Sequence, residues 1–202
     1  MDKKKIIAII ILVIAAIIGW YFMYFTKTPA YSLNMARESI EKHDVLTFKK
    51  HVDLERVLDS ALDDFISVEL EKPEIKNNPF KGLARNIFNS LKPEIVKELT
   101  DECYAKIADD KTDENNEKSN TNAATPADKM KAKTGIGQLK FKEMKDAVIV
   151  DDKAILPVIC VFENDPSKEV TLQLEMKRLE DKTWQVIRVY NFKEYIELME
   201  SK

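Results

Sequence analysis

Near its start the chain reads IIAIIILVIAAIIGWYFMYF, from Ile6 to Phe25, which is twenty residues without a charged side chain. As a helix rising about 1.5 Å per residue, this run would be about 30 Å long, the thickness of a bilayer's hydrocarbon core. Twelve of the twenty residues are Ile, Leu, Val or Phe, and each favours insertion by roughly 0.3–0.6 kcal/mol near the membrane centre. The sequence therefore predicts a transmembrane helix that carries the rest of the chain as a folded domain.

Charges on the two sides of this run predict its orientation. Lys3–Lys5 precede it, whereas only Lys27 follows it closely. Cytoplasmic flanks carry the excess of lysine and arginine, so we expect a cytoplasmic N-terminus and extracytoplasmic residues 26–202. Aromatic residues gather in Trp20–Phe25, as is typical of the outer membrane interface. We predict a single-pass protein of the cell membrane whose first 27 residues are the signal anchor.

A cleaved signal peptide is the main alternative, because it also begins with lysines and an apolar run. Its apolar core usually spans only about 7–15 residues, and the best cleavage site here, Thr28-Pro29-Ala30, is a poor match. A lipidated cysteine anchor is excluded because no cysteine lies near the run. A buried helix of a globular domain is a third possibility, but such helices seldom lack charges over this length.

Composition limits the partners of the exported part. The chain has a net charge of −3, and residues 1–25 contribute +2, so the 177 residues that follow carry −5. A nucleic-acid or anionic-lipid partner would need a basic patch, which this balance disfavours. With only four glycines in the chain, glycine-rich phosphate loops are absent, and no motif indicates a cofactor. The length fits one domain.

The first part of this domain, residues 28–108, reads as a series of amphipathic helices. Thr28, Asp44 and Asp53 are residue types that cap helix N-termini, which predicts helices over 29–42, 45–51 and 54–71. Two further helices are expected over 79–91 and 93–108, each beginning with a proline. Their apolar residues recur at helical spacing, and we expect these stripes to face the core. One stripe contains Phe80, Leu83, Ile87 and Leu91.

The second part changes character twice. Residues 109–134 are almost wholly polar, which predicts a flexible linker or long loop. Apolar residues then alternate with polar ones, which predicts strands near 138–144, 147–150, 169–178 and 184–190. The strand at 154–162 is apolar at nearly every position and so is expected to be covered on both faces, with Pro157 implying an edge or a bulge. A short helix ends the chain, so 135–202 is predicted to be an antiparallel sheet plus a helix. We expect it to form one domain with 28–108. The fold class is α+β, with helices packed on a curved sheet.

The segment that contains the first caps is similar to a known family. It reads Thr28-Pro29-Ala30-Tyr31, then Asp44, then Val52-Asp53-Leu54 and Val57-Leu58-Asp59-Ser60. This pattern resembles an uncharacterised bacterial family of membrane-anchored proteins, a domain of unknown function with Thr/Ser-Pro-Tyr-Tyr, Asp, Val-Asp-Phe and Arg-x-Ser-Leu elements. Ala30, Leu54 and the lack of an Arg directly before Leu58 depart from it. The resemblance implies an exported domain and brings no catalytic residues; the arrangement is also similar to nuclear-transport-factor-like and cystatin-like folds, which host many functions.

Few side chains suggest chemistry, and each has a structural alternative. His43 and His51 have aspartates nearby in sequence, but a metal site needs three or four converging ligands, so helix-end histidines are expected. Asp59, Asp63 and Asp64 offer a carboxylate face for a hard cation, yet no calcium-binding loop accompanies them, and a solvated face is expected. We expect Asp44 and Asp53 to serve as caps, and we predict no catalytic, metal-binding or cofactor-binding residue.

Two cysteines, Cys103 and Cys160, lie on apolar patterns. Outside the cytoplasm they could form a disulfide, and the alternative is two buried thiols that pack as small hydrophobes.

The leading hypothesis is a non-enzymatic, membrane-anchored binding or interaction module, attached to the lipid bilayer through residues 6–25. Its partner would be an envelope protein, and nucleic acid is not expected. One alternative is a carrier of a small apolar molecule or lipid, with a cavity between sheet and helices near Val158 and Cys160. Another is an enzyme on a cone-shaped scaffold that uses Asp44, Asp53 or His51.

Overall fold

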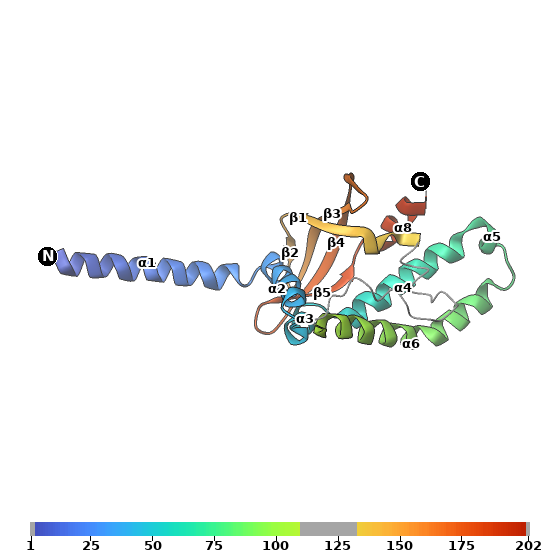
Figure 1. The fold of residues 1–202 in the computed structure, drawn as a ribbon, viewed down its shortest axis with the longest axis horizontal. Helices are drawn as coiled ribbons and strands as arrows, with labels where there is room; N and C mark the ends of the chain where they lie inside the picture. Colours follow the sequence, from blue (N-terminus) through green and yellow to red (C-terminus); the bar gives the residue numbers. More distant parts are fainter. Residues whose placement is uncertain (1–2, 110–132, 201–202) are drawn as a thin grey trace.

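A computed structural model describes residues 3–109 and 133–200 and shows a mixed fold of helices and one antiparallel sheet (Figure 1). The expected α+β class is confirmed. The helices are α1 (Lys3–Phe25), α2 (Pro29–Glu41), α3 (Val45–His51), α4 (Leu54–Glu71), α5 (Pro73–Lys76), α6 (Lys81–Ala108) and α8 (Phe192–Glu200), with a 3-10 turn η1 (Ile136–Gln138). The strands are β1 (Leu139–Met144), β2 (Val148–Val150), β3 (Lys153–Phe162), β4 (Asp165–Arg178) and β5 (Trp184–Val189).

The five-stranded sheet has the order β1-β3-β4-β5, and β2 pairs with the same edge of β3 as β1 does. Pro157 explains why this edge is divided between two strands. Its carbonyl accepts a hydrogen bond from the Lys145 N–H (2.9 Å), beyond the end of β1, so the missing proline N–H lies on the same edge. A proline cannot donate to a neighbouring strand, and the ladder is interrupted there.

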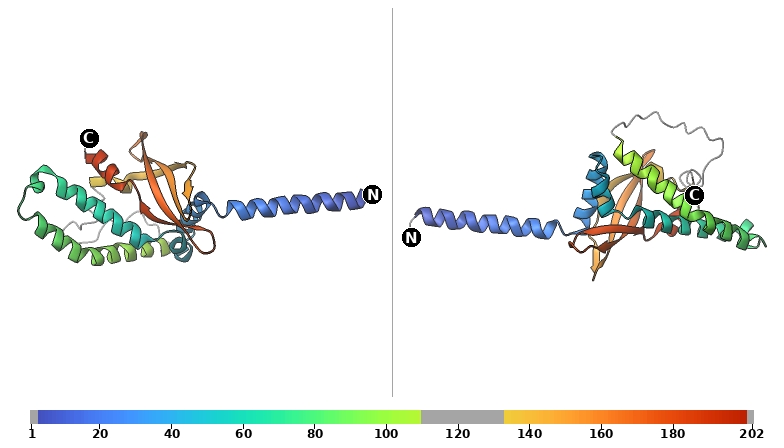
Figure 2. Two further views of the ribbon diagram at one scale, coloured as in Figure 1. Left: turned by 180° about the vertical axis from the view of Figure 1, so that it is seen from behind. Right: turned by 90° about the horizontal axis from the view of Figure 1, so that it is seen from below.

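Helices cover one face of the sheet (Figure 2). Alternate residues of β3 are buried there with residues from α4, α6 and α8 in one core; these strand residues are Ala154, Leu156, Val158, Cys160 and Phe162. The intervening apolar residues of β3, such as Ile155 and Ile159, are only half-buried. The expectation that this strand is covered on both faces is therefore wrong, because no helix packs over the second face of β3 among the described elements.

Helix α2 packs through small residues. Its buried positions are Pro29, Ser32, Ala36 and Ser39, whereas the larger apolar residue Ile40 is exposed. Small side chains allow the helix backbone to lie close to β5, and polar ones there are satisfied locally: the Ser39 hydroxyl donates to the Ala36 carbonyl (2.6 Å). The buried face of α2 is therefore formed mainly by small residues rather than by its larger apolar side chains.

Helix α6 replaces the two helices expected around Pro93. It runs without interruption from Lys81 to Ala108 with the proline inside it, because residues on both sides of Pro93 pack toward α4: Phe88 before it and Val96 after it belong to the main core. Helices α4, α5 and the first half of α6 form an arm that extends beyond the sheet, on the side opposite to α1 (Figures 1 and 2). The stripe that begins at Phe80 is exposed on this arm, so its expected burial is wrong.

Two segment boundaries also differ from expectation. The strand expected near 169–178 begins earlier, since β4 starts at Asp165. The expected linker, 109–134, lies outside the described residues between 110 and 132, but its last residue, Thr134, is fully buried. The Thr134 carbonyl accepts a hydrogen bond from the Tyr195 hydroxyl (2.5 Å). Thr134 therefore belongs to the folded domain.

Helix α1 projects from the rest of the molecule (Figure 1). The three residues 26–28 join its end to α2. Within the described residues, no single helix has both the length and the hydropathy of a membrane span. Ile9–Phe25 and Pro29–Glu41 reach these values only as a pair, with a 77° bend between them.

Candidate functional site

Helix α1 is an apolar surface that no other part of the described chain covers. Its side chains from Ile6 onward are exposed wherever they are described, and Trp20 keeps 76% of its surface accessible. Contiguous apolar surface of this extent is unusual on a monomer and indicates a membrane or protein contact. The helix is therefore the first candidate for a functional region.

The junction between α1 and the folded domain is organised around Trp184, the first residue of β5. The Trp184 backbone N–H donates to the Ser32 hydroxyl (2.9 Å), and its indole N–H donates to the Lys27 carbonyl (2.9 Å). The His51 ring nitrogen Nδ1 lies 3.0 Å from the Trp184 carbonyl and acts as donor there. The side chain is almost fully buried, so three separate segments of the helical half meet at one residue of the sheet.

A second contact fixes the end of α1 to the β4–β5 turn. The Lys27 ammonium donates to the backbone carbonyl of Asp181 (2.7 Å). The Asp181 carboxylate pairs with Lys50 (2.6 Å) and accepts hydrogen bonds from the Thr183 hydroxyl and backbone N–H. These bonds, the one with Lys50 first, hold the pKa of Asp181 well below its usual range. Lys27, two residues beyond the end of α1, is therefore anchored to the sheet.

The two histidines have separate structural contacts. His51 is buried and bound to the Trp184 carbonyl, as described above. His43 has a left-handed backbone (φ 56°), and its Nδ1 lies 3.0 Å from the Ile107 carbonyl at the end of α6. Among the described residues, no group of three or more His, Cys, Asp or Glu side chains is placed to hold a metal ion.

The acidic face of α4 binds cationic side chains of the protein itself. Asp59 and Asp63 both contact the Lys92 ammonium of α6, at 2.7 and 2.8 Å. Asp64 lies 3.3 Å from the Arg188 guanidinium of β5, and burial raises the pKa of this carboxyl. The expectation of a solvated face is confirmed for Asp59 and Asp63, which are exposed although they pair with Lys92. It is wrong for Asp64, whose side chain is largely buried beside Arg188.

The two aspartates expected as caps are confirmed as caps. The Asp44 carboxylate accepts from the Thr47 N–H (3.0 Å) and hydroxyl, and these bonds lower its pKa. The Asp53 carboxylate accepts from the Arg56 N–H (3.3 Å). Thr28 caps α2 in the same way, through the Tyr31 N–H.

No disulfide joins Cys103 and Cys160 in the structure. Cys160 lies in the core on β3, where burial raises the pKa of its thiol, as the alternative of a packed thiol predicts. Cys103 is half-buried on α6.

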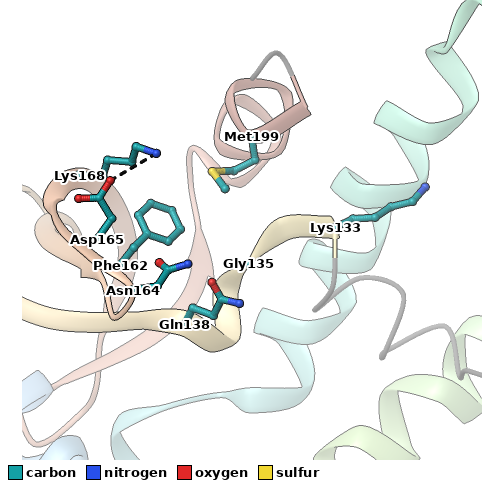
Figure 3. A pocket seen from close by; sticks show the side chains of 8 residues that line it. All are labelled: Lys133, Gly135, Gln138, Phe162, Asn164, Asp165, Lys168 and Met199. Atoms are coloured by element: carbon teal, nitrogen blue, oxygen red, sulfur yellow. Dashed lines mark ion pairs between the residues drawn. The ribbon is translucent and has the colours of Figure 1, made fainter.

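A pocket of about 460 Å³ lies where the end of the sheet meets the C-terminal helix (Figure 3). Phe162 and Met199 provide its apolar surface, and Lys133 and Lys168 stand at its sides. Lys168 pairs with Asp165 (3.4 Å) and Lys133 with Glu69 (2.7 Å). Both cations are thus paired with carboxylates of the protein, and Gln138 and Asn164 add neutral amides to the lining. The arrangement would suit a small, largely apolar molecule with a neutral polar group.

Gly135 shapes this pocket. Its φ of +62° is strained for other residues, and a Cβ there would lie 3.5 Å from Phe162 and 3.6 Å from Met199. No local pattern in the sequence indicates the pocket, because its residues come from three separate segments, 133–138, 162–168 and Met199. His43, His51, Asp44 and Asp53 do not line it, and neither do Val158 and Cys160.

Comparison with protein-family models, with curated proteins and with solved structures found no match to the chain. The resemblance of residues 28–62 to a family of unknown function therefore stays a prediction.

Proposed function

We propose that this protein is a single-pass membrane protein whose residues 26–202 form a non-enzymatic binding module on the extracytoplasmic side. The observation that carries the proposal is the uncovered helix α1, which is apolar on every side. A helix that is apolar all round is stable only inside a protein core or a membrane, and the described residues offer it no core. The lysines before it and the aromatic residues at its end support the orientation.

The junction supports the role of α1 as an anchor. A flexible tether would need no contacts, whereas here the Lys27 side chain and carbonyl both bind the β4–β5 segment. The domain would therefore be held at a fixed height and orientation relative to the membrane. The side chains for which the sequence allowed catalysis, Asp44, Asp53 and His51, are used in caps and in the Trp184 contact, which favours binding over catalysis.

Alkaline extraction of membranes from cells that produce the full chain tests the anchor. We expect the protein to stay in the membrane pellet, and the double variant Ile10→Lys/Ile14→Lys to move to the soluble fraction, because each lysine at mid-membrane costs about 2.5–3.5 kcal/mol. The matched control is Leu46→Lys, a residue of α3 that is 81% exposed and should not affect extraction. Release of the unsubstituted protein by alkali would contradict the proposal.

A second function, binding of a small molecule, is favoured by the pocket of Figure 3. Native mass spectrometry of the gently purified chain should then reveal an added mass of a few hundred daltons. Met199→Trp would fill the pocket and remove this mass, whereas Leu198→Trp on the neighbouring, exposed position would retain it. An unchanged adduct in Met199→Trp would show that the ligand lies elsewhere.

A further inference from the structure

Strand β2, Val148–Val150, lies at an edge of the sheet and is apolar at all three positions. It pairs with β3 on one side, and no described strand pairs with its other side. Its three side chains are between 47% and 65% exposed. Proteins usually protect such an edge with charged side chains or prolines, and none lies within β2. The β2 edge is therefore open to pairing with a further strand.

The backbone of Ile149 directs its hydrogen-bonding groups to this open edge. Successive residues of a strand within an antiparallel sheet bond alternately to the two neighbouring strands. The Pro157 carbonyl accepts from the Lys145 N–H (2.9 Å), so the odd-numbered residues of β3 bond toward the side where β2 lies. The two odd-numbered residues nearest the turn are the register partners of Val148 and Val150. These two valines therefore bond to β3, and the N–H and C=O of Ile149, between them, point away from β3.

A pocket of about 270 Å³ adjoins this edge on the face of the sheet that no described helix covers. Val148, Val150 and Ile155 line it together with Tyr190, which is 55% exposed. A strand added to β2 would direct alternate side chains to this face, and a large apolar one would reach across the valines into the pocket. Extended peptides bind to sheet edges in this way, because backbone hydrogen bonds hold the strand while pockets select its side chains.

The unpaired charges beside β2 are negative. Asp146 lies before the strand and Asp151 after it; both are exposed, and neither has an ion-pair partner among the described residues. Lys145 and Lys153, by contrast, are paired with glutamates of the protein, at 2.6 and 3.8 Å. This distribution of charge would attract an added strand that has a lysine or arginine at each end.

The same charges disfavour two other occupants of the edge. When two β2 strands pair antiparallel so that all their apolar residues match, Ile149 lies opposite Ile149 of the second copy. Asp146 of each copy then approaches Asp152 of the other, and like charges in opposite positions are destabilising. An anionic bilayer surface would repel these carboxylates as well, and it has no peptide backbone to bond Ile149.

We propose that the β2 edge binds an extended segment of another protein, with a large apolar side chain at its centre and a lysine or arginine at each end. The segment adds a further strand to the sheet, bonds the backbone of Ile149 and places its apolar side chain in the pocket beside Tyr190. This proposal names the partner of the proposed binding module and rests on that role, but it does not rest on the membrane anchor.

Fluorescence anisotropy of a labelled synthetic peptide, KVTFTVK, with the full chain in mild detergent tests the site. The phenylalanine supplies the side chain for the pocket, and the lysines supply the terminal charges. We expect saturable binding, and binding of the control peptide EVTFTVE that is weaker by about tenfold or more. Equal affinities for the two peptides, or no saturable binding of KVTFTVK up to about 1 mM, would overturn the proposal.

A proline at the centre of β2 tests the backbone contact. Ile149→Pro removes the outward N–H but no bond to β3, so it should weaken binding of KVTFTVK by about tenfold or more. Ile149→Ala also shortens the side chain but keeps the N–H, and as the matched control it should bind the peptide nearly as well as the unsubstituted chain. Equal losses in the two variants would overturn the proposal, as would a dimer in detergent that only Ile149→Pro dissociates, which would assign the edge to a second copy.

A pair of neutral substitutions tests the charges without risk to the fold. Asp146→Asn/Asp151→Asn should abolish the preference for KVTFTVK over EVTFTVE, and asparagine tolerates the left-handed backbone of Asp151 (φ 54°). The matched control, Glu94→Gln/Glu98→Gln, removes two exposed carboxylates of α6 and should retain the preference. A preference that survives the loss of both aspartates would overturn the proposal. These measurements use no membrane, so release of the chain by alkali would overturn the anchor alone.

Discussion

Helices α4 and α6 lie side by side, and both have apolar residues at helical spacing, yet they direct them differently. In α4 the row that contains Leu62 and Phe65 is buried against the sheet. In the first half of α6 the row that contains Leu83 and Ile87 faces away from the domain. Periodicity therefore identifies an apolar face but does not say what covers it. On the α4 side of α6, Phe88 and Val96 pack against the core and Lys92 pairs with Asp59 and Asp63.

We expect the largest effect on stability from a substitution in the buried row of α4. Leu62 is 1% exposed in the main core, so Leu62→Ala should lower the free energy of unfolding by about 3 kcal/mol through lost burial and a cavity. Urea unfolding of the full chain in mild detergent, followed by tryptophan fluorescence, measures this change. A loss below about 1 kcal/mol would show that α4 does not anchor the core as described.

The ion pairs between Lys92 of α6 and α4 should contribute less to the free energy of unfolding than the burial of Leu62. Lys92→Ala removes the cation between two carboxylates and leaves Asp59 and Asp63 as like charges one helical turn apart, so we expect a loss of about 1 kcal/mol. Lys97→Ala, on an exposed position of the same helix, is the control and should be neutral. Equal stabilities of the two variants would mean that apolar packing alone orients α6.

The contact between α4 and β5 predicts a dependence on pH. Burial raises the pKa of Asp64 in the folded state, so its contribution to stability is fully present below the unfolded pKa and is lost as the pH rises through the folded value. Between about pH 4 and pH 7, the unsubstituted protein should lose stability relative to Asp64→Asn. Unfolding curves of both proteins across this range provide the test, and a relative gain with rising pH contradicts the burial described for Asp64.

We expect the smallest effect on stability from a substitution in the exposed row of α6. Ile87→Ser should change the free energy of unfolding by no more than about 0.5 kcal/mol, measured in dilute protein where copies do not associate, because the side chain is exposed within one chain. A loss similar to that of Leu62→Ala would show that the apolar row of α6 that contains Leu83 and Ile87 is covered by its own domain, and the comparison between the two helices would fail.

Local signals predicted much of the fold. Capping side chains correctly identified the starts of α2, α3 and α4, because Thr28, Asp44 and Asp53 act only on the next turn of their own helix. Alternation identified the strands, and their antiparallel arrangement is confirmed. These features depend on neighbours in sequence, which a single chain displays directly.

Features that depend on distant residues were not predictable in this way. Pro93 predicted the start of a helix, but it lies inside α6. Residues before and after it, Phe88 and Val96, both pack toward α4 and keep the helix continuous. The pocket of Figure 3 joins residues from separate segments, and the role of Trp184 depends on Ser32, His51 and Lys27. The burial of Ser32 and Ser39 on α2 was not predicted, because serine gives no hydrophobic signal.

The central claim is that α1 spans a membrane and leaves the domain outside the cytoplasm. Labelling of single introduced cysteines with a membrane-impermeant maleimide tests it directly, with the unsubstituted chain as background control. Lys153→Cys, at an exposed position of the sheet, should react in intact cells, whereas Lys4→Cys should react only after permeabilisation. Protection of Lys153→Cys in intact cells, or reaction of Lys4→Cys without permeabilisation, would contradict the account.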